Sequence, residues 1–306
     1  MNQKLKIIGF GIGTSSKQYL ENYRDEHEII ALSDWDETTH GTMRYGFEII
    51  NPYEFEKYEY DKIIILSFYV KEIIQQLKER LNIDPDKIIV PPKHKIKGGI
   101  LPFQHQSTKK FAGELIVYFN KMAEKADIDL FLEFGTLLGL TRDGDVIDWD
   151  DDVDFGINEE DSDKLVETLL QHKTELPYSD KLNWTANIRE DKDNNVWYVS
   201  LSFTNKKEFL FHPFEIAFGV RKFFGDRSVC MRNSYLSCDK EHFIKNETIK
   251  FLNAEIKVPY KHEKFLDLLY GDWRTPQVYT FGSHYGSSHS GSNEEVKVSV
   301  EEKTLF

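Results

Sequence analysis

Carboxylates and large apolar side chains alternate along residues 150–157, and this alternation is the strongest constraint that the sequence places on the fold. Positions 150, 152 and 154 hold aspartates and positions 153, 155 and 157 hold apolar residues, namely Asp150, Asp152, Val153, Asp154, Phe155 and Ile157. Side chains alternate between the two faces of a β-strand. The pattern therefore predicts a strand over 150–157 with a carboxylate face and a core face. A solvated acidic loop would not need apolar residues at this spacing, and the glycine and glutamate of an EF-hand are out of register.

Seven aspartates fall between Asp143 and Asp154. Carboxylates on one strand face repel each other unless a cation lies between them. Mg²⁺ is the natural cation, because it prefers oxygen ligands and is commonly shared between carboxylates and substrate phosphates, and Mn²⁺ is the alternative. We therefore expect a divalent metal site on this strand.

The composition narrows the classes of partner. The chain has 306 residues and a formal net charge of −13, so it lacks the positive field that attracts nucleic acid, and no nucleic-acid partner is expected. No run of apolar residues reaches the length of a membrane span, and the N-terminus shows no basic start followed by a long apolar core. We expect a cytoplasmic protein without an integral membrane segment, and peripheral membrane association stays open.

The length predicts two domains, followed by a tail. Residues 1–97 alternate short β-branched runs with helical periodicity, which predicts a small Rossmann-like parallel sheet. Residues 98–281 are expected to form a second domain, after a Pro- and Gly-containing linker. Residues 282–306 begin with a Gly/Ser-rich stretch and are expected to form a flexible tail.

A glycine loop follows the first predicted strand. Its glycines, Gly9, Gly11 and Gly13, resemble a dinucleotide-binding turn, and Asp34 ends the second strand where such folds place a ribose-binding acid. The spacing is G-x-G-x-G, which falls short of the full G-x-G-x-x-G. A nucleotide-binding or scaffold domain is therefore favoured over an NAD(P)-dependent one.

The second half of the chain is expected to mix helices and strands. Apolar periodicity predicts helices and short apolar runs predict strands. The expected helices begin near Ser107 and span 161–171 and 261–270, and the expected strands span 128–133, 196–203 and 211–217.

Two motifs in this half resemble those of the LicD and fukutin-related family. The first is Gly135-Thr-Leu-Leu-Gly139, then Arg142, then Trp149-Asp-Asp-Asp-Val-Asp154, and the second runs from Val258-Pro-Tyr to Leu269-Tyr-Gly-Asp-Trp-Arg-Thr-Pro276. The resemblance covers roughly residues 105–277. It implies a nucleotidyltransferase fold of the DNA polymerase β type with a mixed sheet.

In that fold a Gly-Ser-like turn, a strand with paired carboxylates and a third carboxylate surround Mg²⁺. The resemblance assigns the turn to Gly135 and Thr136 and the metal-binding pair to Asp152 and Asp154. For the third ligand the chain offers Glu215, where family members more often carry Asp; the alternative is an edge-strand glutamate that faces water.

Further roles follow from the same resemblance. Asp150 is the candidate general base or second-metal ligand. Arg142 is a candidate for the donor phosphate, with pairing to a neighbouring aspartate as the alternative, and Arg274 is another candidate.

The resemblance implies an enzyme that moves a phosphorylated alcohol from a CDP-activated donor to a hydroxyl of a glycan or glycolipid, with release of CMP. The transferred group would be of the phosphocholine, ribitol phosphate or glycerol phosphate type, in capsule or cell-surface polysaccharide biosynthesis. Three alternatives stay open: transfer of a nucleoside monophosphate to a small molecule or protein, an NAD(P)-linked sugar oxidoreductase that uses the glycine loop, and a non-catalytic binding protein.

Overall fold

The computed structural model describes residues 4–67, 69–92, 95–96, 100–231, 235–276 and 298–306. The chain divides into two compact units, with the change from the first to the second between Ile100 and Leu101. Each unit is described by itself. The domain limits expected from the sequence, 1–97 and 98–281, remain a proposal.

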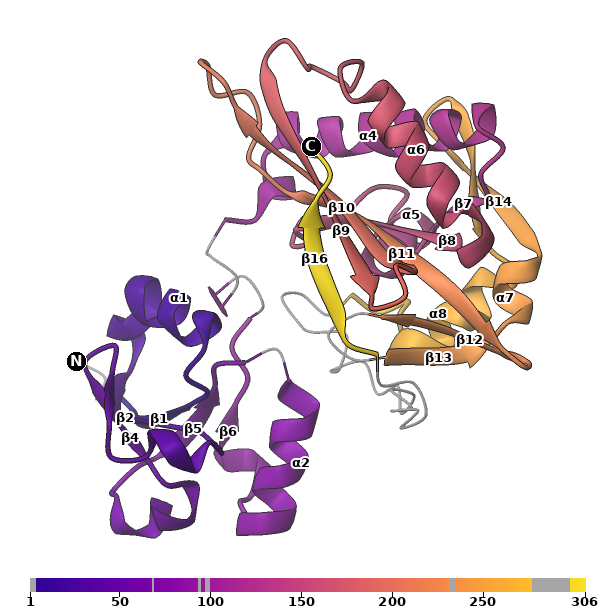
Figure 1. The fold of residues 1–306 in the computed structure, drawn as a ribbon. Helices are drawn as coiled ribbons and strands as arrows, with labels where there is room; N and C mark the ends of the chain where they lie inside the picture. Colours follow the sequence, from indigo (N-terminus) through magenta and orange to yellow (C-terminus); the bar gives the residue numbers. More distant parts are fainter. Residues whose placement is uncertain (1–3, 68, 93–94, 97–99, 232–234, 277–297) are drawn as a thin grey trace. The chain divides into compact units, whose positions relative to one another are not determined.

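The first unit is built on a six-stranded sheet in the order β3-β4-β2-β1-β5-β6 (Figure 1). All neighbouring strands run parallel except β3 and β4. The strands are β1 (Lys6–Phe10), β2 (Glu28–Ser33), β3 (Met43–Arg44), β4 (Phe47–Ile50), β5 (Lys62–Ile65) and β6 (Ile88–Ile89), and the helices include α1 (Thr14–Tyr23) and α2 (Val70–Leu81). Isoleucines of β1 and β5 are almost fully buried. The largely parallel sheet confirms the expected Rossmann-like module; β3 and β4 were not predicted.

The glycine loop connects β1 to α1, as expected. Gly11 has a φ of +108°, a value that favours glycine, and a side chain there would lie 2.9 Å from the Leu66 carbonyl oxygen. Gly13 is the N-cap of α1, and nothing lies within 4 Å of where its side chain would be. The Ser16 hydroxyl donates to the Gly11 carbonyl. The Ser16 hydrogen bond thus fixes the buried side of the loop, and the space beside Gly13 is open.

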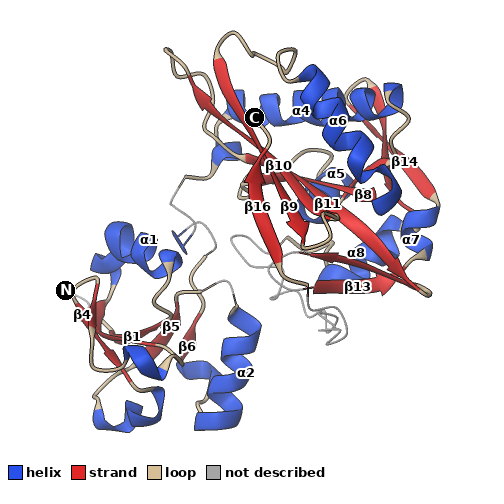
Figure 2. Cartoon of the chain, in the orientation of Figure 1, coloured by secondary structure: helices blue, strands red, loops and turns tan. Residues whose placement is uncertain are grey.

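The second unit is built on a mixed sheet (Figure 2). Its main path runs β13-β12-β11-β10-β9-β16, and β8 pairs with both β11 and β7. Only the β8–β11 pair is parallel. The strands are β7 (Leu130–Leu132), β8 (Asp152–Asn158), β9 (Leu182–Asp191), β10 (Val196–Asn205), β11 (Glu215–Phe224), β12 (Arg227–Met231), β13 (Tyr235–Asp239) and β16 (Val300–Thr304). The predicted α/β class with a mixed C-terminal sheet is confirmed.

One face of this sheet forms the core. Phe155 of β8 and Phe218 of β11 are stacked at 5.4 Å, and Phe119 of the long helix α4 (Gln106–Lys125) packs edge-on against both. Period-two alternation thus directs the apolar half of β8 to the helices, as the sequence predicts. The remaining helices are α5 (Phe134–Arg142), α6 (Ser162–His172), α7 (Glu241–Ile244) and α8 (His262–Tyr270). No helix in the described part of the chain is long and apolar enough to cross a membrane.

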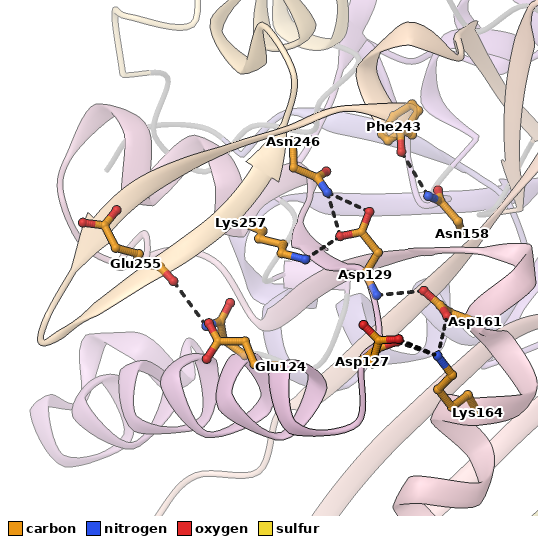
Figure 3. A network of polar contacts seen from close by, with 11 residues as sticks. Glu124, Asp127, Asp129, Asn158, Asp161, Lys164, Phe243, Asn246, Glu255 and Lys257 are labelled. Carbon is orange, nitrogen blue, oxygen red and sulfur yellow. Dashed lines mark hydrogen bonds and ion pairs between the residues drawn. The ribbon is translucent and has the colours of Figure 1, made fainter.

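A separate hairpin, β14 (Asn246–Phe251) with β15 (Ala254–Pro259), is joined to the unit by polar contacts centred on Asp129 (Figure 3). The Asp129 carboxylate accepts hydrogen bonds from Asn246 and from the Lys257 ammonium at 2.7 Å. The Asp129 backbone N–H donates to Asp161 at 2.7 Å. The hairpin is thereby fixed to the residues that flank β7 and α6.

The end of the chain differs from the expected flexible tail. Residues 277–297 lie outside the described part of the structure, but Val300–Thr304 form the edge strand β16, which pairs antiparallel with β9. Four of the five residues are charged or polar, so the strand carries little apolar pattern. Backbone pairing, which does not depend on side-chain type, creates it.

Candidate active site

The acidic strand β8 lies beside β11 in parallel register. Asp152 is opposite Glu215, and Asp154 is opposite Ala217. Because registered residues on neighbouring strands point to the same face, the side chains of Asp152, Asp154 and Glu215 belong to one face of the sheet, opposite the face of Phe155 and Phe218. One expectation is wrong: β8 begins at Asp152, so Asp150 lies in the turn before the strand rather than on its face.

Three consecutive carboxylates converge at this turn. Ligand atoms of Asp150, Asp151 and Asp152 all lie within 4.8 Å of one another, and all three side chains are half-buried. Oxygen donors at this spacing suit a divalent ion such as Mg²⁺. Asp154 and Glu215 are outside this group: Asp154 is buried, with 3% of its surface exposed, and Glu215 is exposed. The structure thus adds Asp151, which a strand-face argument had excluded.

Gly135 and Thr136 lie in the first turn of α5, directly against the acidic segment. The Asp154 backbone N–H donates to the Thr136 hydroxyl at 2.8 Å. A side chain at Gly135 would lie 2.0 Å from Asp150 Oδ2. The motif expected to form a turn is therefore helical, and it does bring together Gly135, Thr136, Asp150 and Asp154.

The other aspartates of the run have basic partners. Asp143 accepts two hydrogen bonds from the Arg142 guanidinium. Lys109 of α4 contacts Asp148 at 2.7 Å and Asp145 at 3.2 Å. Burial lowers the pKa of Lys109, but the hydrogen bonds with Asp148 and Asp145 outweigh it and raise that pKa above its ordinary value. These pairs fix the loop that leads to residues 150–152.

A fully buried ion pair lies next to β8. Glu133, which precedes α5, and Arg221 of β11 both have 0% exposed side chains, and the Arg221 Nε donates to Glu133 Oε1 at 2.9 Å. Glu133 also donates its backbone N–H to the Asp154 carbonyl. Gly156 makes room for this pair, because a side chain there would lie 2.7 Å from the Glu133 carboxyl carbon. Sequence reasoning missed the pair, since its members are 88 positions apart.

The two arginines proposed for the donor phosphate have acidic partners within their own segments. Arg142 pairs with Asp143, and its guanidinium lies 5.9 Å from the ring of Trp149. Arg274 pairs with Glu263 and Asp267 of α8. For Arg142 the alternative expectation, pairing with an aspartate, is what the structure has. The second motif is nevertheless close to the first, since α8 packs against α5.

The residues predicted to bind a ligand in the N-terminal domain belong to the first unit. Gly9, Gly11 and Gly13 form the β1–α1 loop, and the Asp34 carboxylate accepts a hydrogen bond from the Asp36 backbone N–H at 3.0 Å.

In the second unit, a hollow of about 500 Å³ lies between α4 and α6 and includes Lys121 and His172. None of the predicted site residues lines it.

The fold and the site define the class of protein: an α/β unit whose mixed sheet carries a group of carboxylates that could hold a metal ion. Residues 127–261 match the LicD/FKTN/FKRP nucleotidyltransferase domain, and residues 3–89 match the C2185-like N-terminal domain. The chain therefore carries a LicD-family domain preceded by a C2185-like domain, and the resemblance seen in the first motif is confirmed; most of the second motif lies beyond residue 261.

Two solved structures of other proteins are similar to this chain at low sequence identity. UDP-D-quinovosamine 4-dehydrogenase from Vibrio fischeri is 22% identical over 29% of this chain and 79% of its own, with a TM-score of 0.24. A myo-inositol dehydrogenase from Corynebacterium glutamicum is 12% identical over 83% of this chain and 81% of its own, with a TM-score of 0.23. No curated protein sequence matches the chain.

Proposed function

We propose that this protein transfers a phosphorylated alcohol, of the phosphocholine, ribitol phosphate or glycerol phosphate type, from a CDP-activated donor to a glycan or glycolipid hydroxyl. The observation that carries the proposal is the convergence of the Asp150, Asp151 and Asp152 carboxylates against Gly135, inside the region that matches the LicD family. The cytoplasmic location expected from the sequence is part of the same proposal.

The donor set suits a divalent ion. We assign Mg²⁺, or Mn²⁺ in its place, to Asp152 with its neighbour Asp151, beside Asp150, and we keep Asp154 and Glu215 on the same sheet face as further ligands. Bound there, the ion would neutralise the charge of the donor diphosphate.

The reaction breaks the phosphoanhydride bond of the donor and forms a phosphoester bond to the acceptor. The acceptor oxygen attacks the phosphorus distal to the nucleoside, the bond from that phosphorus to the bridging oxygen breaks, and CMP leaves with that oxygen. The proton of the acceptor hydroxyl passes to a carboxylate, for which Asp150 is the candidate. Its backbone turn and its contact with Gly135 fix its position, which a general base requires.

The first prediction tests this site with CDP-choline, CDP-ribitol and CDP-glycerol, Mg²⁺ and a glycan acceptor. We expect CMP release, and Asp152→Asn should lower its rate by about 100-fold or more, because the carboxylate at the centre of the group is lost. Asp148→Asn is the matched control: this aspartate belongs to the same run but pairs with Lys109, which keeps Asp145 as its partner.

The control should keep the rate within about twofold, as for an exposed ion pair. Pyrophosphate release from CTP in place of CMP release would instead favour transfer of a nucleoside monophosphate. Full activity of Asp152→Asn would contradict the proposed site. Quenching or enhancement of NADH fluorescence by the N-terminal unit would favour the oxidoreductase alternative.

A further inference from the structure

Glu215 is held by a tyrosine from the neighbouring strand. The Tyr198 hydroxyl donates to Glu215 Oε1 at 2.6 Å. Tyr198 of β10 is registered with Gly219 of β11, four residues from Glu215 and on the same face. The one residue of β11 between them on this face is Ala217, and the small size of Ala217 and Gly219 gives the tyrosine ring room to reach along the strand. A carboxylate has two oxygens, so a hydrogen bond at Oε1 leaves Oε2 to bind an ion.

The tyrosine ring is itself held from the next two strands. Arg189 of β9 is registered with Tyr198, and its guanidinium carbon lies 5.0 Å from the ring centroid. The Arg189 Nε donates to Glu302 Oε2 at 2.8 Å, and Glu302 is registered with Arg189 across the β9–β16 pair. A line of contacts therefore crosses the sheet from Glu302 to Glu215, and Glu215 is next to Asp152.

We infer that Tyr198 is a positioning residue for Glu215, and that the C-terminal strand β16 supports the site by holding Arg189 over the Tyr198 ring. The hydrogen bond fixes the direction of the carboxylate, so that Glu215 loses less freedom when it binds an ion. The strand β16 lies outside residues 127–261, which match the family. The inference rests on the proposed metal site.

The test measures Mn²⁺ binding to the full chain by isothermal titration calorimetry, without any donor or acceptor. Tyr198→Phe should weaken Mn²⁺ binding about tenfold, the size of effect seen when a partner of a metal ligand is removed. Glu302→Gln should weaken it by about twofold, because exposed pairs contribute little. Lys303→Gln is the matched control, since Lys303 is the next residue of β16 and pairs with Glu190 instead. It should bind Mn²⁺ as the parent does.

A double-mutant cycle shows whether Tyr198 acts through Glu215. In a Glu215→Gln background, Tyr198→Phe should cause no further loss of Mn²⁺ affinity. All variants should keep the melting temperature of the parent to within about 2 °C, because the contacts are at least partly exposed. Unchanged or tighter Mn²⁺ binding by Tyr198→Phe, or an equal loss in both backgrounds, would overturn the inference.

The variant Asp152→Asn distinguishes a failure of the Tyr198 inference from a failure of the proposed function. If Asp152→Asn abolishes Mn²⁺ binding and Tyr198→Phe leaves it intact, the positioning role is wrong and the metal site stands. If the parent binds no Mn²⁺, or binds it equally after Asp152→Asn, the metal site is wrong and the positioning role with it.

Discussion

The two glycines of Gly135-Thr-Leu-Leu-Gly139 are explained by the acidic loop that packs on α5. A side chain at Gly135 would lie 2.0 Å from Asp150 Oδ2, and one at Gly139 would lie 2.6 Å from the Asp145 carbonyl oxygen. Glycine disfavours a helix by about 1 kcal/mol relative to alanine. Glycine at these two positions makes α5 less stable than alanine would, and the missing side chains let the acidic loop approach the backbone of the helix.

Gly135→Ala is therefore expected to separate stability from activity. The added methyl group displaces the Asp150 carboxylate, and a misplacement of about 1 Å lowers a rate by about 100-fold. Unfolding in urea should change little, since the better helix propensity of alanine offsets part of the strain. Gly113→Ala in α4 is the control, because a methyl group there first meets the Phe251 ring at 3.3 Å. Activity of Gly135→Ala equal to that of the control would argue against a role for Asp150.

At the scale of elements, apolar periodicity accounts for what the sequence predicted. The helix at Gln106–Lys125 and the strand at Val196–Asn205 have regular apolar faces and were expected. The strands that were missed carry charged or polar side chains on exposed positions, as β14 and β16 do. The partner of β16 is β9, more than 100 positions earlier, so the pattern of this segment alone cannot reveal the pairing. Asp151 was missed for a related reason, since the turn before β8 gathers three consecutive carboxylates where a strand would separate them.

The buried pair of Glu133 and Arg221 ties the start of α5 to β11 and gives an element-scale prediction. Burial lowers the pKa of Arg221, but the Cys230 thiol and the Glu133 carboxylate more than offset this, so its pKa stays above the ordinary value. Glu133→Gln leaves a buried cation without its counter-charge and should lower the free energy of unfolding by about 3 kcal/mol or more.

Urea unfolding of the full chain measures this loss. Asp239→Asn is the matched control, because it breaks an exposed arginine pair, Arg227 with Asp239, and should cost less than about 1 kcal/mol. A loss after Glu133→Gln as small as that of the control would show that the pair does not hold the two elements together.

At the scale of the whole molecule, each unit has its own apolar core. Ile64 belongs to the core of the first unit and Leu201 to that of the second, and both are almost completely buried. The chain length and the β-branched runs that end before the linker led us to expect two domains, and the limits of these domains stay a prediction. The ligand of the glycine loop was not predictable in the same way, since three glycines at this spacing specify no ligand and the space beside Gly13 is open.

Separate cores lead us to expect two unfolding transitions in differential scanning calorimetry. Ile64→Ala should lower one transition and Leu201→Ala the other, because truncating a buried aliphatic side chain costs about 2–5 kcal/mol in the unit that contains it. Mn²⁺ at 100 times its dissociation constant stabilises the unit that binds it by about 2.7 kcal/mol. It should therefore raise only the transition that Leu201→Ala lowers. A shift of the other transition would locate the metal in the first unit, and a single shared transition would contradict the independence of the two cores.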